Sequence, residues 1–258
     1  MAGATTDRER LRRLAEELAT AASAEPGNKP RRRLPVVNNA DAAGLVAMLH
    51  AQLDTAIDHR SEAAAAAGIV IACKRGCTAC CTVPVATTEA EAVAVAVWLA
   101  QPENAEARAQ YLAAYPVWRA SLGSLIEDVI AADGAPNESE LYTTYGLRRA
   151  MCPFNHDGAC TIYAVRPSMC RIAHAVDTSE HCGDPRNTIQ TIKFPEVAET
   201  FASQRGVQTL LHAALRTKLA LELLPKAVMR RLSRATAFPN QPCPCGSGQK
   251  FKSCCRSS

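Results

Sequence analysis

Apolar residues recur every three or four positions along most of the chain, which is the spacing that gathers them on one face of an α-helix. Leu11, Leu14 and Leu18 follow this spacing within a short amphipathic helix predicted over residues 7–20. Further helices are predicted over 42–67, 89–100, 104–115, 117–132 and 195–235, with Pro225 breaking the last one into two. The pattern therefore predicts a mainly α protein.

Local signals predict where two of these helices begin and end. Asp41 is expected to cap the helix over 42–67, and Gly68 to end it. Thr88 and Glu91 have the spacing of a capping box, in which each side chain bonds to the other residue's backbone N–H. This box is expected to open the next helix, 89–100.

Two segments lack helical periodicity. Residues 23–39 combine three prolines with the basic run 31–33, which predicts a flexible linker whose arginines are solvated, or touch an acidic surface or nucleic acid. Residues 152–186 are rich in cysteine, proline and histidine, and metal ligation would supply the internal staple that such a segment needs to become ordered. The expected organisation is a helix and basic linker over 1–39, a helical cysteine-cluster domain over 40–236 and a very small zinc module over 237–258.

Composition narrows the possible functions. The chain of 258 residues has a net charge of +4, which is too small to indicate a nucleic-acid partner. The N-terminus has no apolar run of signal-peptide type, and no segment has the ~20 apolar residues of a membrane span, so we expect a cytoplasmic protein. In a reducing compartment, twelve cysteines indicate metal or redox chemistry. The alternative is six disulfides in an exported protein.

The last four cysteines form a compact set. Cys243, Cys245, Cys254 and Cys255 supply four thiols within 13 residues, and the Gly-Ser-Gly turn at 246–248 lets the two pairs meet. Four sulfurs at tetrahedral corners suit a closed structural zinc site. Such a site has a formal charge of −2, which Lys250, Lys252 and Arg256 are expected to offset, with hydrogen bonds to sulfur.

This tail resembles the SEC-C motif, a zinc-binding tail named after the translocation ATPase SecA. All four cysteines match, as does the surrounding Pro-Cys-Gly-Ser-Gly-x-Lys-x-Lys sequence. The resemblance implies bound zinc and docking on a protein partner.

The other eight cysteines lie between residues 73 and 182. They open with Cys73, Cys77, Cys80 and Cys81, and the later members are Cys152, Cys160, Cys170 and Cys182. Such thiols are ligands for zinc and iron. In extended backbone, Cys80 and Cys81 would point to opposite sides and serve two metals, whereas on a turn both could reach one.

The first seven of these cysteines resemble the YkgJ-type cysteine-cluster family. The likeness includes Cys152-Pro153-Phe154, the run Gly158 to Tyr163, Arg166-Pro167 and Cys170-Arg171. It implies that Cys73, Cys77, Cys80, Cys81, Cys152, Cys160 and Cys170 chelate zinc or iron. Cys182 lies beyond the matching pattern.

Other residues of the segment have expected roles beside the thiols. Arg166 and Arg171 are expected to balance thiolate charge or to pair with an anionic substrate. Ile162 and Tyr163 are expected to pack over the cluster and limit water. His156, His174 and His181 could replace a thiol as ligand, although a solvated or hydrogen-bonded imidazole is the simpler expectation.

Three functions fit these motifs. The first is an iron–sulfur or mixed iron and zinc centre with a redox or group-transfer role, because seven thiols exceed the four of a closed zinc site. The second is a non-enzymatic zinc scaffold or adaptor. The third is a radical-SAM enzyme, suggested by the spacing of Cys73, Cys77 and Cys80 but opposed by the helices that follow. Whether the protein is an enzyme stays open at this level.

Overall fold

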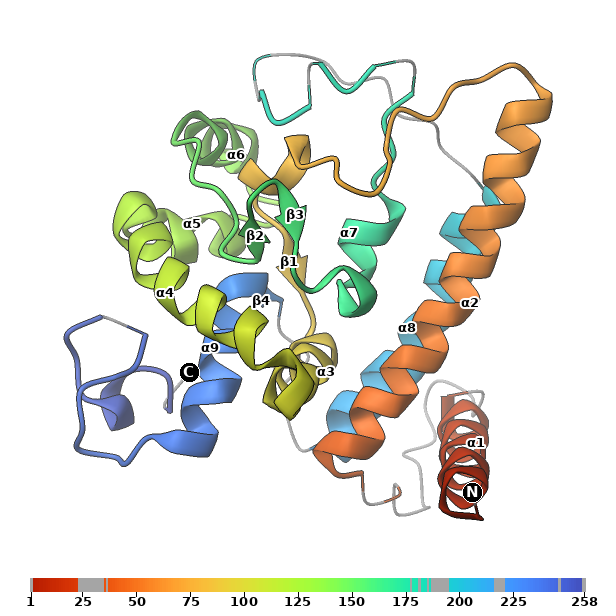
Figure 1. Cartoon of the computed structure of the whole chain (residues 1–258), viewed down its shortest axis with the longest axis horizontal. Coiled ribbons are helices and arrows are strands. Elements are labelled where there is room, and N and C mark those ends of the chain that lie inside the picture. The colour runs from red at the N-terminus through yellow and green to blue at the C-terminus, as the bar shows by residue number, and fades with distance from the viewer. Residues whose placement is uncertain are drawn as a thin grey trace.

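The computed structural model describes residues 2–22, 35, 37–176, 178–180, 182–184, 186, 195–215, 221–245 and 247–256. Most of the expected linker and its basic run lie outside these residues. Among the described elements, helices dominate, as predicted (Figure 1). They are α1 (Ala2–Ala22), α2 (Asn39–Ala66), α3 (Glu89–Ala100), α4 (Ala105–Leu122), α5 (Leu125–Ala131), α6 (Glu138–Leu147), α7 (Ser168–Ile172), α8 (Pro195–Ala214) and α9 (Leu224–Thr236).

Short strands and turns connect these helices. Strand β1 (Ala86–Thr87) pairs antiparallel with β4 (Glu222–Leu223), and β2 (Asn155–His156) pairs with β3 (Ala159–Cys160). The 3₁₀ turns are η1 (Ala79–Thr82), η2 (Pro102–Asn104), η3 (Tyr163–Val165) and η4 (Phe251–Ser253). The β1–β4 pair joins residues more than 130 positions apart, which no local pattern predicts.

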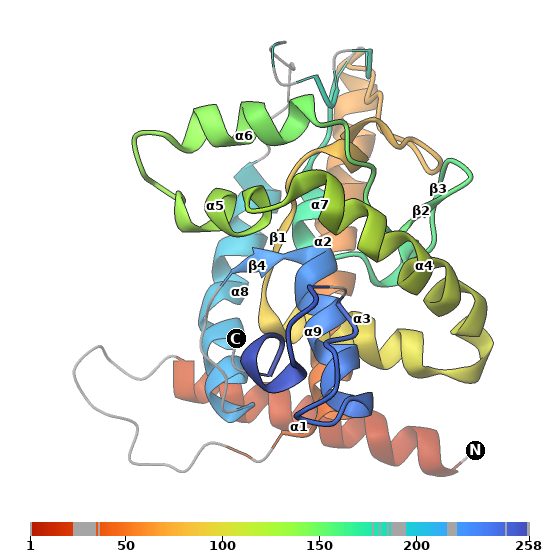
Figure 2. The same ribbon diagram turned by 90° about the vertical axis from the view of Figure 1, so that its left-hand side faces the viewer.

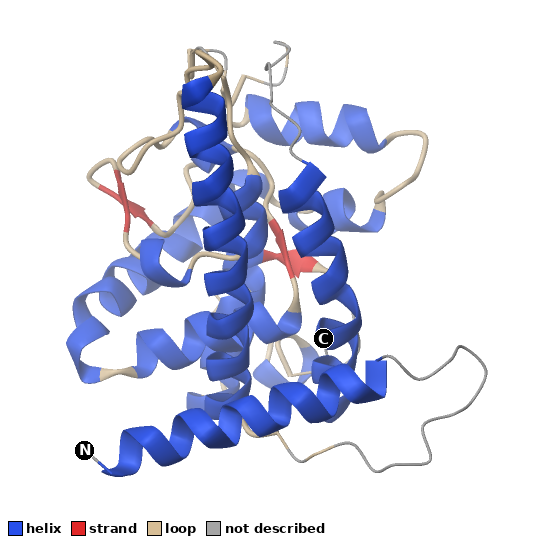
Figure 3. Ribbon diagram, turned by 90° about the vertical axis from the view of Figure 1, so that its right-hand side faces the viewer, coloured by secondary structure: helices blue, strands red, loops and turns tan. Residues whose placement is uncertain are grey.

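Helices α2 and α8 lie side by side, and α1 crosses their lower ends (Figure 3). Leu14 and Leu18 of α1 are buried there against Ala42 and Leu45, which confirms the apolar face predicted for the first helix. The other face of the molecule holds the larger core, built from α3, α4 and α9. No helix in the described part of the chain is long and apolar enough to cross a membrane.

Several helices differ from the prediction. The helix predicted over 117–132 is divided between α4 and α5, and α6 and α7 were not predicted. Two further differences have a local cause. Asn38, not Asp41, is the N-cap of α2, and Asp41 is the third helical residue that closes a capping box with it. Helix α4 continues through Pro116, where a break was predicted. Proline removes the hydrogen bond to the carbonyl four residues earlier. That carbonyl belongs to Leu112, a residue that is 42% exposed.

The predicted capping box at α3 is present, and it does more than begin a helix. Glu91 is buried and bonds to the backbone N–H of Thr88 at 3.1 Å. It also accepts a bond from the N–H of Ser168 at 2.8 Å and lies 3.3 Å from His50 Nε2. One carboxylate therefore ties α3 to α2 and to the start of α7, the helix that carries Cys170.

These bonds predict an acid-sensitive fold. Burial alone would raise the pKa of Glu91, but the bonds from His50, Ser168 and Thr88 outweigh it and lower the pKa to about 2, from a usual value of 4.5. Stability from this group is therefore complete above pH 4.5 and is lost as the pH falls through 2, by about 3 kcal/mol. Denaturant unfolding at several pH values should show this loss. Glu91→Gln should remove that part of the pH dependence, and an unchanged pH profile would contradict the assignment.

Candidate metal centres

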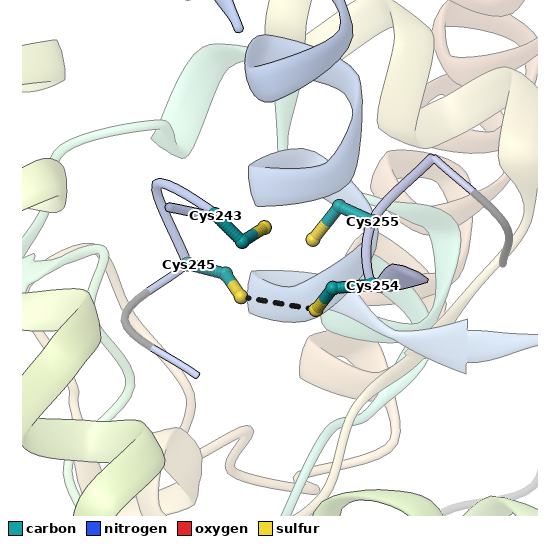
Figure 4. Close-up of side chains that lie close together, drawn as sticks. All are labelled: Cys243, Cys245, Cys254 and Cys255. Carbon is teal, nitrogen blue, oxygen red and sulfur yellow. Dashed lines mark hydrogen bonds between the residues drawn. The ribbon is translucent and has the colours of Figure 1, made fainter. Parts of the chain in front are cut away.

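The four tail cysteines converge on one point (Figure 4). Their sulfur atoms all lie within 4.8 Å of one another, and Cys245 Sγ and Cys254 Sγ are 3.4 Å apart. The chain doubles back because Gly248 adopts a positive φ of 73° and the N–H of Cys243 bonds to the carbonyl of Gln249 at 2.8 Å. The turn predicted from the glycines thus brings the two cysteine pairs together.

The charges of the tail suit a divalent metal. The Cys255 thiol, acting as a hydrogen-bond donor, lowers the pKa of Cys245 to about 4, although burial opposes this, and the pKa of Cys255 is raised in turn. This effect favours the thiolate form of Cys245. Four sulfurs in a closed site are what structural zinc takes, with Zn–S bonds of about 2.3 Å. The donor set fits zinc.

The tail sulfurs have a polar neighbour that was not predicted. Lys250, Lys252 and Arg256 are exposed, and the hydroxyl of Ser247 makes the contact to Cys254 Sγ at 3.2 Å. The cation whose pKa responds to a tail thiolate is Arg119 of α4. Burial lowers its pKa, but Tyr115 and the Cys245 thiolate outweigh that effect and raise it. Arg119 therefore shares the charge compensation expected of the three tail residues.

The tail is built into the main core. Cys243, Cys245, Cys255 and Phe251 are each at most 5% exposed. They belong to the same cluster of buried side chains as the aromatic residues of α4 and the apolar face of α9. Figure 2 shows the tail lying over α9. The zinc module predicted at 237–258 is thus packed against the helical domain.

The main cysteines come together from several segments. Cys80 and Cys81 lie on the η1 turn, and the carbonyl of Cys81 accepts a bond from the N–H of Cys152 at 2.8 Å. The β2–β3 hairpin carries Cys160 and α7 carries Cys170. The backbone near Cys73 pairs with 175–176, and the N–H of Ala175 bonds to Cys73 Sγ at 3.1 Å. The two sequence-distant halves therefore meet, as predicted.

The thiols form two overlapping groups. We place two thiols in the same group where the charge of one raises the pKa of the other. Burial, and then Cys81, Cys73 and Cys77, raise the pKa of Cys80 to about 11. Burial and the charges of Cys152, Cys80, Cys160 and Cys81 raise the pKa of Cys170 well above its usual value. Cys80 and Cys81 are thus common to both groups.

The main thiols are spaced more widely than those of the tail. Within the described residues, the tail is the place where three or more potential ligand atoms all lie within 4.8 Å of one another. The seven predicted ligands share one region of the molecule, and their ligation stays a prediction. Cys80 and Cys81 lie on the η1 turn, which is one of the two arrangements that the sequence left open for them.

Cys182 joins the first group, although it lies beyond the resemblance. Burial and the thiolates of Cys73 and Cys77 raise its pKa. The next residue, Gly183, has a φ of 77° and packs so tightly on η1 that a Cβ atom would lie 2.1 Å from the carbonyl oxygen of Ala79. Only glycine allows this approach. In the sequence, the pair Cys182-Gly183 is the feature that could have indicated that this segment packs beside the other cysteines.

The two arginines have different surroundings. Arg166 stacks on the ring of Tyr163, 3.8 Å from its centroid, and its charge lowers the pKa of Cys160, which burial raises. Arg166 therefore fits the predicted charge balance. Arg171 does not balance thiolate charge in this way. Its buried guanidinium donates hydrogen bonds to both carboxylate oxygens of Asp54 and to the carbonyls of Ala164 and Arg166. Its contacts are structural.

The apolar and histidine predictions have mixed outcomes. Ile162 is 1% exposed in the core, whereas Tyr163 is half-buried between the guanidinium groups of Arg75 and Arg166. His156 is exposed beside Asp157. Burial and the charges of Arg60 and Arg166 lower the pKa of His174 to about 4, so its imidazole is neutral at physiological pH. His181 lies outside the described residues.

Comparison with known families agrees with this geometry. Residues 72–199 match the family named CxxCxxCC and described as "Putative zinc- or iron-chelating domain", and residues 240–257 match the SEC-C motif. The first match covers all eight main cysteines, Cys182 included, and the second covers the four of the tail. No curated protein and no solved structure matches the chain.

Proposed function

Since residues 72–199 belong to the zinc- or iron-chelating CxxCxxCC family and the tail is a SEC-C motif, we propose that the main domain holds an iron–sulfur or mixed iron and zinc thiolate centre. In this proposal the centre has a redox or group-transfer role. The tail holds one structural zinc ion and serves as a docking surface.

One observation carries the proposal, namely that eight thiols share one region in two groups that overlap at Cys80 and Cys81. A closed zinc site uses four thiolates. Eight thiols in two groups with common members suit a centre of more than one metal ion, and iron–sulfur centres take thiolate ligands. Such a centre supplies one-electron chemistry when it is bound.

The surrounding residues would tune this centre. Arg166 lies close enough to Cys160 to stabilise its thiolate, and Tyr163 with its two flanking arginines covers the neighbouring surface. The raised pKa values of Cys80, Cys81, Cys152 and Cys160 mean that metal binding must release protons from these thiols. Metal loading should therefore be favoured as the pH rises.

Anaerobic purification tests the identity of the main metal. We expect a brown protein that contains iron and sulfide in addition to zinc, because thiolate-bound iron–sulfur centres absorb visible light. Cys77→Ser should lower the iron content at least about twofold by removing one ligand. Lys74→Ala, in the same loop and exposed, is the matched control and should leave the iron content unchanged. Elemental analysis and the visible spectrum provide the measurement.

The zinc scaffold is the second candidate, and the packing of the tail favours it. The tail module is buried against the helical core, as a purely structural element would be. Arg171, a candidate for substrate binding, makes structural contacts instead. A colourless protein that contains zinc without iron or sulfide would refute the iron–sulfur centre and leave the scaffold.

The docking proposal concerns the outer side of the tail. Lys250, Lys252 and Arg256 are exposed there, whereas the cysteines and Phe251 face the core. Three positive charges close together favour a partner with an acidic surface. We therefore propose that an acidic protein docks on this basic side, in a complex that weakens as the salt concentration rises.

A further inference from the structure

Tyr111 occupies a central place between the two cysteine sets. It lies on α4, is 0% exposed, and its hydroxyl donates a hydrogen bond to the carbonyl of Pro225 at 2.6 Å. Its ring stacks on Phe154, with the centroids 4.3 Å apart and the planes within 5°. Pro225 begins α9, against which the tail packs, and Phe154 lies in the loop between Cys152 and Cys160.

Each cysteine set lies close to this ring. Burial raises the pKa of Tyr111 well above its usual value, and the charges of Tyr115, Cys152 and Cys255 add to the effect. Cys152 belongs to the main cluster and Cys255 to the tail. The packing agrees, because one continuous core contains Tyr111, Phe154 and the tail cysteines, with Cys152 and Cys160 packed against it.

The loop that carries Phe154 is held as a unit. The carbonyl of Phe154 accepts bonds from both the N–H and the hydroxyl of Thr161, at 2.8 and 3.0 Å. A shift of the Phe154 ring therefore moves the hairpin that holds Cys160. On the other side, α9 is fixed to Tyr111 through the Pro225 carbonyl, so a change in the tail reaches the same ring.

We infer that Tyr111 is a positioning residue that couples the two metal centres, so that each binds its metal more tightly when the other is loaded. This inference rests on the proposed function, since it requires metal in both centres. Tail zinc holds the tail and α9 in place, which keeps Tyr111 and Phe154 stacked and the Cys152–Cys160 loop in its binding conformation. Thermodynamic linkage makes the effect reciprocal, so the main metal also favours zinc in the tail.

Metal release from the full-length protein tests this coupling. The half-life of the main-domain metal is measured in excess EDTA, with zinc and iron followed separately by elemental analysis. The double variant Cys245→Ser, Cys255→Ser should shorten that half-life about fivefold or more. In a Tyr111→Leu background, the half-life should already be short, and the tail substitutions should shorten it no further.

Two variants separate coupling from simple loss of packing. Tyr111→Phe keeps the stacked ring but removes the hydrogen bond to the Pro225 carbonyl, so it should retain its main-domain metal and lose most of the fivefold response. Tyr145→Leu is the control, because Tyr145 is also a buried aromatic residue whose pKa is raised by the charge of Cys152. Tyr145 belongs to α6, and no tail cysteine contributes to the shift of its pKa. The fivefold response should therefore persist in this variant.

The outcomes are distinct. If the tail substitutions leave the half-life of the main-domain metal unchanged in the otherwise unmodified protein, the coupling is overturned and the proposed function stands. A fivefold response that survives in Tyr111→Leu would refute the role of this residue. Absence of metal from the main domain of the unmodified protein would refute the proposed function and the coupling together. If Tyr111→Leu does not fold, a Tyr111→Phe variant that keeps the full response would refute the link through the Pro225 carbonyl.

Discussion

Replacing Cys245 with serine should release the tail zinc and lower the free energy of unfolding of the whole protein by about 4 kcal/mol or more. The substitution removes one of four ligands from a closed site. In small zinc modules, metal binding is most of the folding free energy. Here Cys243, Cys245, Cys255 and Phe251 are also part of the core formed by α4 and α9, so disorder in the tail uncovers the aromatic residues of α4. The effect should therefore reach the helical domain.

Denaturant unfolding and zinc analysis of the same samples would measure both effects. Ser253→Ala is the matched control, because Ser253 lies in the same module and is exposed. It should retain zinc and unfold as the unmodified protein does. If Cys245→Ser lost its zinc while the helical domain unfolded at the same denaturant concentration as before, the tail would be an independent module.

Arg171→Met should have the second large effect, a loss of about 2–4 kcal/mol together with a lower metal content in the main domain. The guanidinium is 5% exposed, bonds to Asp54 of α2 and satisfies the carbonyls of Ala164 and Arg166. Methionine fills much of the volume but leaves both carbonyls without this donor. Asp54 is 45% exposed, so water limits the cost on its side.

The comparison with Asp54→Asn separates the two contributions. Asparagine keeps a hydrogen-bond acceptor for Arg171 and loses only the charge, so we expect a loss of about 1 kcal/mol or less. The measurements are denaturant unfolding and the metal content per chain. Equal losses for the two substitutions would mean that the ion pair, and not the bonds to the 164–166 backbone, holds this segment to α2.

The sequence was a reliable guide where a local rule operates. The helix over 89–100 was predicted with its capping box, because Thr88 and Glu91 act within one turn of backbone. The tail site was predicted with all four ligands, because 13 consecutive residues contain both the ligands and the turn that gathers them. Prediction failed at Pro116, where a local rule predicts a break but the helix continues, with Tyr111, Tyr115 and Trp118 on both sides of the proline buried in the core.

Long-range packing explains the site residues whose neighbours the sequence did not reveal. Arg171 meets Asp54 across 117 residues, and Gly183 reaches the carbonyl of Ala79 from a segment beyond the seven cysteines whose pattern the sequence revealed. Neither contact leaves a periodic trace in the chain. The partners of Arg171, and the closeness of Cys182 to Cys73 and Cys77, are consequences of how α2, α7 and η1 pack.

By itself, the sequence determined that this is a mainly α protein with four clustered cysteines in its tail and a second set of thiols, because helix periodicity and ligand spacing are properties of short stretches of chain. The tertiary structure alone decided that the tail is packed into the helical core and that Tyr111 lies between the two sets of cysteines. The physical reason is that burial brings together α4, α9, the Phe154 loop and the tail, which are far apart in the sequence but share one apolar core.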